Sequence, residues 1–396
     1  MNDEQRKILD MVEQGIITSE DAARLLKALD GGPAAPQKPA APPPPPAAEP
    51  ASGFHDLRRL GKELQEGAAE AARLAMEEAK KALKGLGKIQ FPTDSQEAEN
   101  ILGANWEQED EDFREAQNSP LEYPLMAGEL ENLNIQWIRG NVELRPTEGG
   151  EIRITEYSRM PLEEREKTVV TLEDGELSIA WGKEKMRQSV PYSKHLLVEL
   201  PENCFHGLEE LEIKSIAGNI RLQGFSAENI TLSQVSGRIE VSELHAEELK
   251  LSAVSGQITA RDLQAEDLDV SGVSGEVGIT GFHAEDANLR IVTGSLNAFG
   301  DCDELSLDSV SGLASVTLNR LPEEANVHTV SGRSVLYLPD SEDGFTVNYH
   351  AKFGAFHCDF PLTGELNAKS GEGAYGDGDA EIDMNAISGA VELRRA

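Results

Sequence analysis

The sequence predicts a mainly β fold, a single-domain parallel β-solenoid (β-helix) with coils of about 19 residues, preceded by a small α-helical N-terminal region. The first observation behind this prediction is a row of glycines, most of them in the motif Val-Ser-Gly, at positions 218, 237, 256, 275, 294, 312 and 332. A short, nearly fixed period indicates one supersecondary unit stacked on copies of itself. The second observation is that apolar and polar residues alternate within each copy, which is typical of a strand with one buried face.

One coil is expected to hold two short strands. Apolar residues stand two and four places after each glycine, as at Ile239 and Val241, and again twelve and fourteen places after it, as at Leu249 and Leu251. Because the period is nearly constant, equivalent residues should form columns, and the inward columns should form a narrow core. The glycine is expected at a tight corner, where it tolerates a positive φ.

The corner opposite the glycine is predicted to carry an acidic column. Glu228, Glu247, Glu266 and Glu285 recur after alanine in four successive copies. They should therefore stack about 4.8 Å apart, the spacing of neighbouring strands. We consider two interpretations of this column: a ladder that binds cations or a basic partner, and a solvated acidic corner that keeps the solenoid soluble.

The N-terminal region differs in character. Residues 1–32 predict a helical hairpin whose apolar positions include Ile8, Val12, Leu25 and Leu26. A segment of this length buries too little surface to be stable alone, so we expect it to bind a protein partner or a second copy. Residues 33–52 form a proline-rich linker, which should be semi-rigid.

Residues 53–88 predict an amphipathic helix. Its apolar row includes Leu57, Leu60, Leu64 and Leu86 and repeats every eleven residues, a period typical of a nearly straight helix or a right-handed coiled coil. This row could mediate self-association or protein docking, could lie on an anionic membrane, or could belong to a solvated helix. Residues 89–127 read as an acidic linker, and residues 128–396 as the β-solenoid, whose irregular first strands should cap the first coil.

Charge is distributed unevenly. Acidic and basic residues nearly balance over 1–88, so residues 89–396 carry almost all of the net charge of −35. Such a surface should repel nucleic acid and attract cationic peptides. The cysteines, at 204, 302 and 358, show no paired spacing, so neither a disulfide framework nor a zinc site is predicted. With no signal-peptide pattern and no long apolar run, we expect a cytoplasmic location, peripheral at the membrane if the 53–88 helix binds lipid.

Two segments carry a resemblance to a bacterial family. The Val-Ser-Gly coils and the closing stretch GDGDAEIDMNAISGAVELRR resemble a β-strand-repeat domain of unknown function that is often labelled an adhesin. The stretch DEQRKILDMVEQGIITSEDAARLLKAL is similar to the SHOCT-type helical hairpin that precedes this domain in envelope-stress proteins of the YvlB and LiaX kind. The resemblance implies a role in cell-envelope stress and, for some members, the sensing of cationic antimicrobial peptides.

Catalytic motifs are not found in the sequence. Gly-rich stretches near residue 375 lack the lysine and the following helix of a phosphate-binding loop. Asp301, Asp303 and Asp308 could be read as lyase or hydrolase carboxylates, but their separation cannot be obtained from sequence. We therefore expect no enzymatic activity, no cofactor and no metal. The predicted function is an envelope-stress or scaffold protein that presents an acidic solenoid, and the alternative is a self-assembling cytoskeletal or adhesin-type solenoid.

Overall fold

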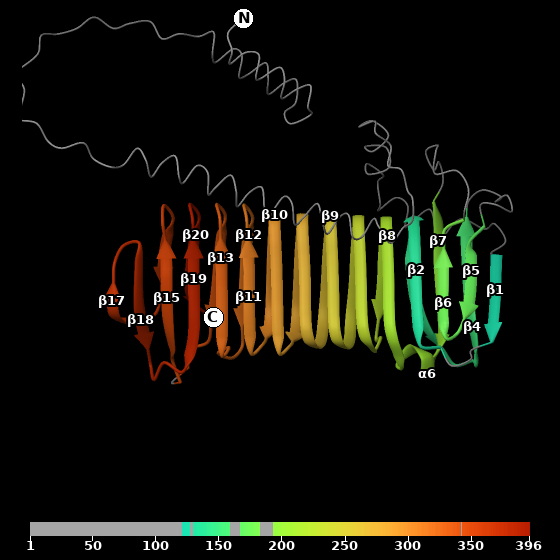
Figure 1. Ribbon diagram of the computed structural model, residues 1–396, viewed down its shortest axis with the longest axis horizontal. Coiled ribbons are helices and arrows are strands. Elements are labelled where there is room, and N and C mark those ends of the chain that lie inside the picture. Colours follow the sequence, from blue (N-terminus) through green and yellow to red (C-terminus); the bar gives the residue numbers. More distant parts are fainter. Residues whose placement is uncertain (1–120, 127–129, 159–166, 183–192, 342) are drawn as a thin grey trace, which may run out of the picture. The chain divides into compact units, whose positions relative to one another are not determined.

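A computed structural model of the chain describes residues 121–126, 130–158, 167–182, 193–341 and 343–396. Within these ranges the chain is mainly β, and its strands lie side by side in one continuous, hydrogen-bonded stack (Figure 1). The predicted hairpin over 1–32, the linkers over 33–52 and 89–120 and the helix over 53–88 lie outside the described residues.

The central coils follow the sequence in order. Three long strands contribute to them, β8 (Leu208–Gln223), β9 (Ala227–His283) and β10 (Asp286–Asp301). All pairings among them are parallel, with Gly218 opposite Gly237 and Gly275 opposite Gly294. The two predicted strands of each coil run on through the corner without a break, which is why β9 is 57 residues long.

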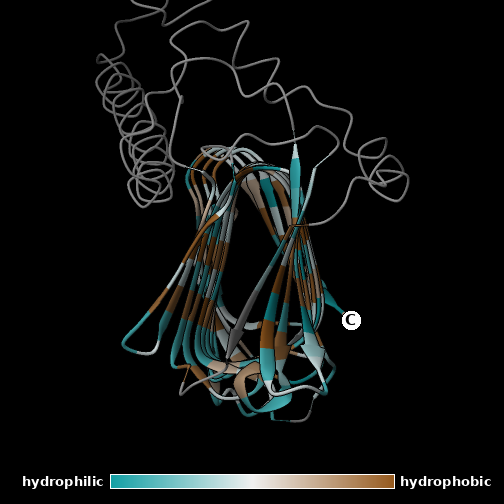
Figure 2. Ribbon diagram, turned by 90° about the vertical axis from the view of Figure 1, so that its right-hand side faces the viewer, coloured by the Kyte–Doolittle hydropathy of each residue, from teal (hydrophilic) through white to brown (hydrophobic). Residues whose placement is uncertain are grey.

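The next two coils are divided at their corners. Their strands are β11 (Glu304–Ser309), β12 (Leu313–Leu318), β13 (Glu324–Thr329) and β14 (Arg333–Leu338). β11 pairs with β13, and β12 pairs with β14, both in parallel. The strands that lead into each corner glycine thus form one wall of the solenoid, and the strands that follow it form the other, as the view along the stack shows (Figure 2).

At the N-terminal end the strands do not stack in the order in which they follow one another in the sequence. Its elements are β1 (Leu121–Met126), β2 (Asn132–Arg139), β3 (Val142–Thr147), β4 (Glu151–Ser158), β5 (Val169–Glu173), β6 (Glu176–Ala180), β7 (Lys194–Pro201) and the short helix α6 (Glu202–Phe205). β2 and β3 stack in parallel both on β8 and on β6 and β7. Outside this coil, β4 and β5 run antiparallel to β7 and β6, and β1 runs antiparallel to β4.

The C-terminal end repeats this plan. Its strands are β15 (Phe345–Ala351), β16 (Ala355–Cys358), β17 (Thr363–Leu366), β18 (Ser370–Tyr375), β19 (Ala380–Ala386) and β20 (Ala390–Arg395). The last coil in sequence, β19 and β20, lies between β13–β14 and β15–β16. β17 and β18 close the end with antiparallel pairing. The solenoid is therefore parallel in its coils, as predicted, and its pairing is antiparallel at both ends, a feature that the predicted parallel solenoid did not include.

One predicted boundary is wrong. β1 lies inside 89–127, the stretch that the sequence assigns to an acidic linker. Its sequence, LEYPLM, contains a proline and no clear alternation, so it gives little strand signal. It forms because β4 offers it an antiparallel edge.

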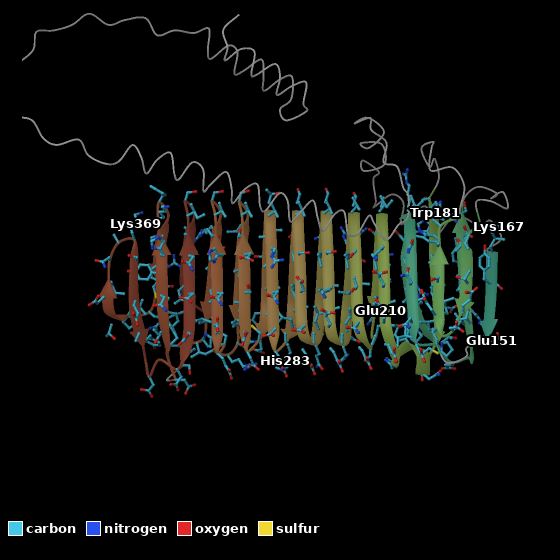
Figure 3. The ribbon with its side chains drawn as sticks, viewed as in Figure 1. Glu151, Lys167, Trp181, Glu210, His283 and Lys369 are labelled. Atoms are coloured by element: carbon cyan, nitrogen blue, oxygen red, sulfur yellow. The ribbon has the colours of Figure 1, made fainter. Side chains whose placement is uncertain are left out.

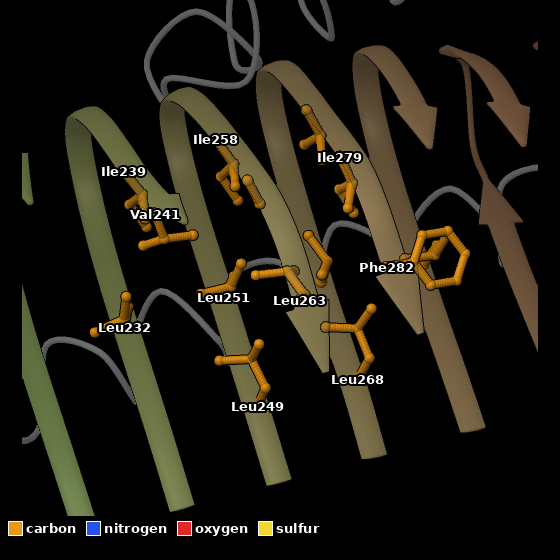
Figure 4. Close-up of a cluster of buried hydrophobic side chains, with 14 of the residues drawn as sticks. Leu232, Ile239, Val241, Leu249, Leu251, Ile258, Leu263, Leu268, Ile279 and Phe282 are labelled. Atoms are coloured by element: carbon orange, nitrogen blue, oxygen red, sulfur yellow. The ribbon is translucent and has the colours of Figure 1, made fainter. Parts of the chain in front are cut away.

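Aliphatic columns fill the central interior (Figure 4). Ile239, Leu249 and Leu251 are fully buried, as are their counterparts Ile258 and Val270 in the next coil. Burying one such side chain contributes about 1.5–3 kcal/mol. A single coil buries too few of them to offset its loss of conformational entropy, so neighbouring coils must stabilise one another.

The glycines are needed for a reason that goes beyond the predicted positive φ. Gly237 has a φ of 122°, but Gly256 does not lie in the positive region. At both positions a Cβ atom would collide with the carbonyl oxygen of the corner glycine one coil earlier. The glycine column thus lets successive corners approach more closely than any side chain would allow.

Candidate interaction surface

The solenoid has two outer faces. We call the outward side chains of strands that lead into a corner glycine the pre-glycine face, and those of strands that follow it the post-glycine face. The alternation of inward and outward residues along each strand identifies these side chains. In β9, for example, the partly exposed Glu248 and Lys250 alternate with the buried Leu249 and Leu251. Figure 3 shows the side chains along the stack as seen from one side.

The predicted acidic column lies at the edge of the pre-glycine face. Glu228, Glu247, Glu266 and Glu285 are all exposed. The backbone N–H of Glu285 donates to the carbonyl of Glu266 at 3.0 Å, so these two residues occupy equivalent places in adjacent coils. The column continues beyond the predicted four, because the backbone N–H of Asp303 donates to Glu285 and that of Glu323 donates to Asp303.

A second acidic row, absent from the sequence prediction, runs beside this column. Strand register places Asp267, Asp286, Glu304, Glu324 and Glu381 opposite one another in successive strands. Glu248 and Glu210 hold the equivalent place in earlier coils, and Asn229 interrupts the row. We call the column and this row together the acidic ridge. The nineteen-residue period that identified the first row could also have identified the second.

Among the residues that the structure describes, cations neutralise little of the acidic ridge. Arg320 contacts Asp303 at 2.5 Å, and Lys250 contacts Glu248. Elsewhere the carboxylates face one another: chiefly the negative charge of Asp286, then partial burial and the charge of Glu324, raise the pKa of Glu304 above its usual range. The ridge is thus a surface on which added positive charge would relieve repulsion.

The post-glycine face is organised differently. Arg221 contacts Glu240 of the next coil at 2.8 Å, and Arg238 contacts the same carboxylate at 3.0 Å. Arg238 also donates to Gln257, which donates to Glu276, at 2.9 and 3.3 Å. A polar ladder therefore joins four successive coils. Burial opposes the ionisation of Glu240, but the hydrogen bonds and charges of the two arginines outweigh it and lower the pKa of this carboxyl.

A similar cluster occupies this face at the C-terminal end. Glu392 is only 6% exposed and lies 2.7 Å from Arg333 and 2.8 Å from Arg394. Burial again opposes its ionisation, and the two guanidinium groups together lower its pKa. Beside it, Phe345, Phe360 and Tyr375 pack with ring centroids 5.0–5.6 Å apart, and Arg395 lies over the Phe360 ring.

A buried charged cluster, which sequence reasoning missed, lies within the N-terminal end. The Lys194 and Glu156 side chains are both 0% exposed, and their charged atoms are 2.7 Å apart. The ammonium group also lies 4.4 Å from the Trp181 ring and 5.2 Å from the Trp137 ring. The Tyr123 hydroxyl and the Thr168 backbone N–H both donate to Glu156. The cluster thus joins β1, β2, β4 and β7 to the residues that flank β5 and β6.

The two charged side chains of this cluster have no exposed surface. A buried ion pair is expensive to desolvate, and this one is compensated by hydrogen bonds and by two indole faces. Nothing in the periodic sequence pattern points to it, because its members come from irregular strands with no common spacing.

The residues predicted to bind a partner or a membrane lie outside the described residues; they are Ile8, Val12, Leu25, Leu26, Leu57, Leu60, Leu64 and Leu86. The three aspartates considered for catalysis have other partners: Asp303 binds Arg320, Asp308 binds Arg290 at 3.3 Å, and Asp301 accepts from Asn319 at 3.4 Å.

Metal and thiol chemistry find no support in the described residues. No group of three histidine, cysteine or carboxylate side chains there could hold a metal ion. Cys302 is buried, and this burial is the main cause that raises its pKa to about 12, so its thiolate is scarcely present at neutral pH. Among the same residues, no helix has the length and apolar character that a membrane span requires.

Comparison with known families gives two matches. The family described as "Toastrack DUF4097" matches residues 130–394, and a "SHOCT-like domain" matches residues 3–34. The search of curated proteins returned no match.

Solved structures of similar proteins come from three bacteria. A "putative cell adhesion protein" from Clostridium sporogenes is 13% identical, with 70% of this chain and 100% of that chain covered and a TM-score of 0.19. Proteins described as a "putative adhesin" from Bacteroides fragilis and from Parabacteroides distasonis are each 9% identical, with 70% of this chain and 98% of theirs covered and TM-scores of 0.29 and 0.26. TM-scores this low support no inference about the fold or the function of this chain.

Proposed function

The chain belongs to the Toastrack DUF4097 family, and on this premise we propose that it is a non-enzymatic scaffold of the bacterial cell-envelope stress response that binds cationic partners on its acidic ridge. The observation that carries the proposal is the continuity of the ridge. Carboxylates stand at equivalent positions from Glu210 to Glu381 in every coil except that of Asn229, where the neighbouring Glu228 of the column is the acidic residue, and parallel pairing holds the backbone.

The physical argument is one of complementarity. Stacked carboxylates repel one another, as the raised pKa of Glu304 indicates. A peptide or protein with regularly spaced lysines or arginines would remove that repulsion while releasing bound counter-ions. The rigid stack fixes the spacing of the charges, so little conformational entropy is lost on binding.

The N-terminal region has a separate role in this proposal. The SHOCT-like match at 3–34 supports a small helical module, and we assign it, together with the helix predicted over 53–88, to oligomerisation or membrane attachment. The protein would then act in the cytoplasm, peripheral to the membrane, with the solenoid as the part that meets the partner.

Calorimetry with a cationic peptide tests the proposal. The full chain should bind a lysine-rich peptide with an affinity that falls as salt rises. The triple variant Asp267→Asn, Asp286→Asn, Glu304→Gln should bind at least about tenfold more weakly, since it removes three adjacent charges. The control variant Glu151→Gln, Glu173→Gln, Glu365→Gln removes the same charge from exposed positions at the two ends.

The comparison between the two variants shows whether the peptide binds the acidic ridge or responds to the net charge alone. Equal binding by both would show that net charge, and not the ridge, attracts the peptide. No binding by the unmodified chain would contradict the proposal directly.

One observation favours a second candidate function, that of a self-assembling solenoid. The coils stack in parallel, and such a stack can grow by strand addition where its edges are open. The antiparallel strands at both ends weigh against end-to-end growth, so we place this function second.

A further inference from the structure

A groove on the post-glycine face lies apart from the acidic ridge. Its volume is about 790 Å³, within the range of small-molecule sites. It is lined by β3, by β8, by the first two coils of β9, and by α6 with His206. His206 is held by an edge-on contact with the buried Phe205 ring, at 5.5 Å between centroids.

Three arginines from three different strands line this groove, Arg145, Arg221 and Arg261. On a chain with a net charge of −35 this concentration of cations is unusual. Two of them are engaged by carboxylates, Arg145 by Glu143 at 2.5 Å and Arg221 by Glu240 at 2.8 Å. In the part of the chain that the structure describes, no carboxylate lies within ion-pair distance of Arg261.

The residues that share the row of Arg261 in the groove are neutral donors and acceptors, whereas Asp262 and Glu243 hold the next place at the adjoining corner. Ser242 occupies the same place one coil earlier, Gln223 lies opposite Ser242 in β8, and Thr259 precedes Arg261 on its own strand. Arg145 stands at the other end of this row, three strand spacings or about 14 Å from Arg261. Across the groove, the row therefore begins and ends with an arginine, and an amide and a hydroxyl side chain lie between the two.

We propose that this groove binds an anionic, polyhydroxylated chain, with an anionic oxygen group on Arg261 and hydroxyl groups on Gln223 and Ser242. An exposed guanidinium without a counter-ion offers a carboxylate or phosphate two parallel hydrogen bonds. Amide and hydroxyl side chains can each donate and accept, as pairing with sugar or polyol hydroxyls requires.

The acidic groups of the groove do not oppose this assignment at the Arg261 end. Glu143 and Glu240 are each held by an arginine. The third carboxylate, Glu202, belongs to α6 and follows the end of β7, whereas Arg261 lies on the second coil of β9. The anionic group therefore meets an uncompensated cation, and the ion-paired residues form the opposite side of the site.

This inference is independent of the proposed function, because it concerns the other face and a ligand of opposite charge. Calorimetry and amide NMR on the full chain, in 0.15 M salt so that the net charge is screened beyond about 8 Å, provide the test. The probes are a trimer of galacturonic acid and a trimer of glycerol phosphate, which separate carboxylate from phosphate, with maltotriose as the neutral control.

Binding of either anionic trimer is expected, and Arg261→Gln should weaken it at least about tenfold. Ser242→Ala should weaken it about threefold without changing the melting temperature. The matched control is Arg290→Gln, at another exposed arginine, which pairs with Asp308 on the pre-glycine face, and it should bind normally. Absence of binding by both anionic trimers, equal binding of maltotriose, or equal loss in Arg261→Gln and Arg290→Gln would overturn the proposal.

Discussion

The central coils and the N-terminal end of the domain reach stability by different means. In the coils every inward place repeats the same aliphatic chemistry, with Ile239, Leu249 and Leu251 as one example. In the N-terminal end the interior holds a desolvated Lys194–Glu156 pair whose ammonium group lies against two tryptophan rings. The coils can stack on copies of themselves, whereas the end has an interior that no other coil could match. This difference indicates how the repeat is terminated. The outermost strands run antiparallel to the strands beneath them, and they pack over an interior whose chemistry differs from that of the coils.

The largest expected effect comes from breaking the buried pair. Lys194→Met should lower the free energy of unfolding by about 3–5 kcal/mol, because Glu156 is left charged, buried and without its counter-ion. The double variant Lys194→Met, Glu156→Leu should recover much of this loss, since both charges are then gone. Urea unfolding measures each value. A double variant as unstable as the single one would show that the pair is not what holds this end.

The next effect concerns the corner of a central coil. Gly256→Ala places a Cβ against the carbonyl oxygen of Gly237 and should cost about 1–3 kcal/mol. Gly278→Ala is the matched control, because the nearest atom to its Cβ lies 3.9 Å away. We expect this control to be neutral or slightly stabilising, since alanine loses less entropy than glycine in a strand. Similar costs at both positions in thermal unfolding would rule out close stacking as the reason for the glycines.

A smaller effect depends on pH at the C-terminal end. The folded-state pKa of Glu392 is lowered, so its contribution to stability is present above its unfolded pKa and is lost as pH falls through the folded value. Glu392→Gln should therefore cost about 1 kcal/mol at pH 7, a modest value because the Arg333 side chain is exposed and that of Arg394 is partly exposed, so solvent screens both charges. Below the folded pKa the variant and the unmodified chain should converge. Melting temperatures measured from pH 7 to pH 3 would show a constant difference if the two arginines were unimportant.

The smallest effect is a gain of stability within the coils. Glu243 has a φ of 56° and holds a corner place that glycine holds in two other coils, at Gly224 and Gly281. Glu243→Gly should stabilise the domain by about 0.5 kcal/mol, because the relief of left-handed strain exceeds the entropy that glycine loses. Glu247→Gly, at a residue outside the positive-φ region, should destabilise it. Denaturant midpoints of the two variants should move in opposite directions.

The repeat made the coils predictable. The spacing of Val-Ser-Gly gave their register, and alternation around residues such as Leu249 gave the inward columns. The acidic ridge was predicted in part: Glu228, Glu247, Glu266 and Glu285 lie where expected, whereas Glu304 and its row follow from the same period and were overlooked. The function of these residues stays a prediction.

The ends could not be predicted from the sequence in the same way. Glu156 and Lys194 meet through two strands that pair antiparallel, and no periodic signal connects them. β1 contains a proline and forms only because β4 provides an edge. The last coil in the sequence, β19 and β20, lies in the stack between β13–β14 and β15–β16. Local sequence patterns do not indicate this order. The Arg261 groove likewise depends on which strands become neighbours.

We propose that the antiparallel strands at the two ends close the stack, so that the protein forms discrete species and does not polymerise. Sedimentation velocity of the full chain over a hundredfold range of concentration, with electron microscopy of the same samples, tests it most directly. We predict species of fixed size whose particles are no longer than a few stacked domains. Filaments that lengthen with concentration would contradict the claim and would favour the self-assembling solenoid.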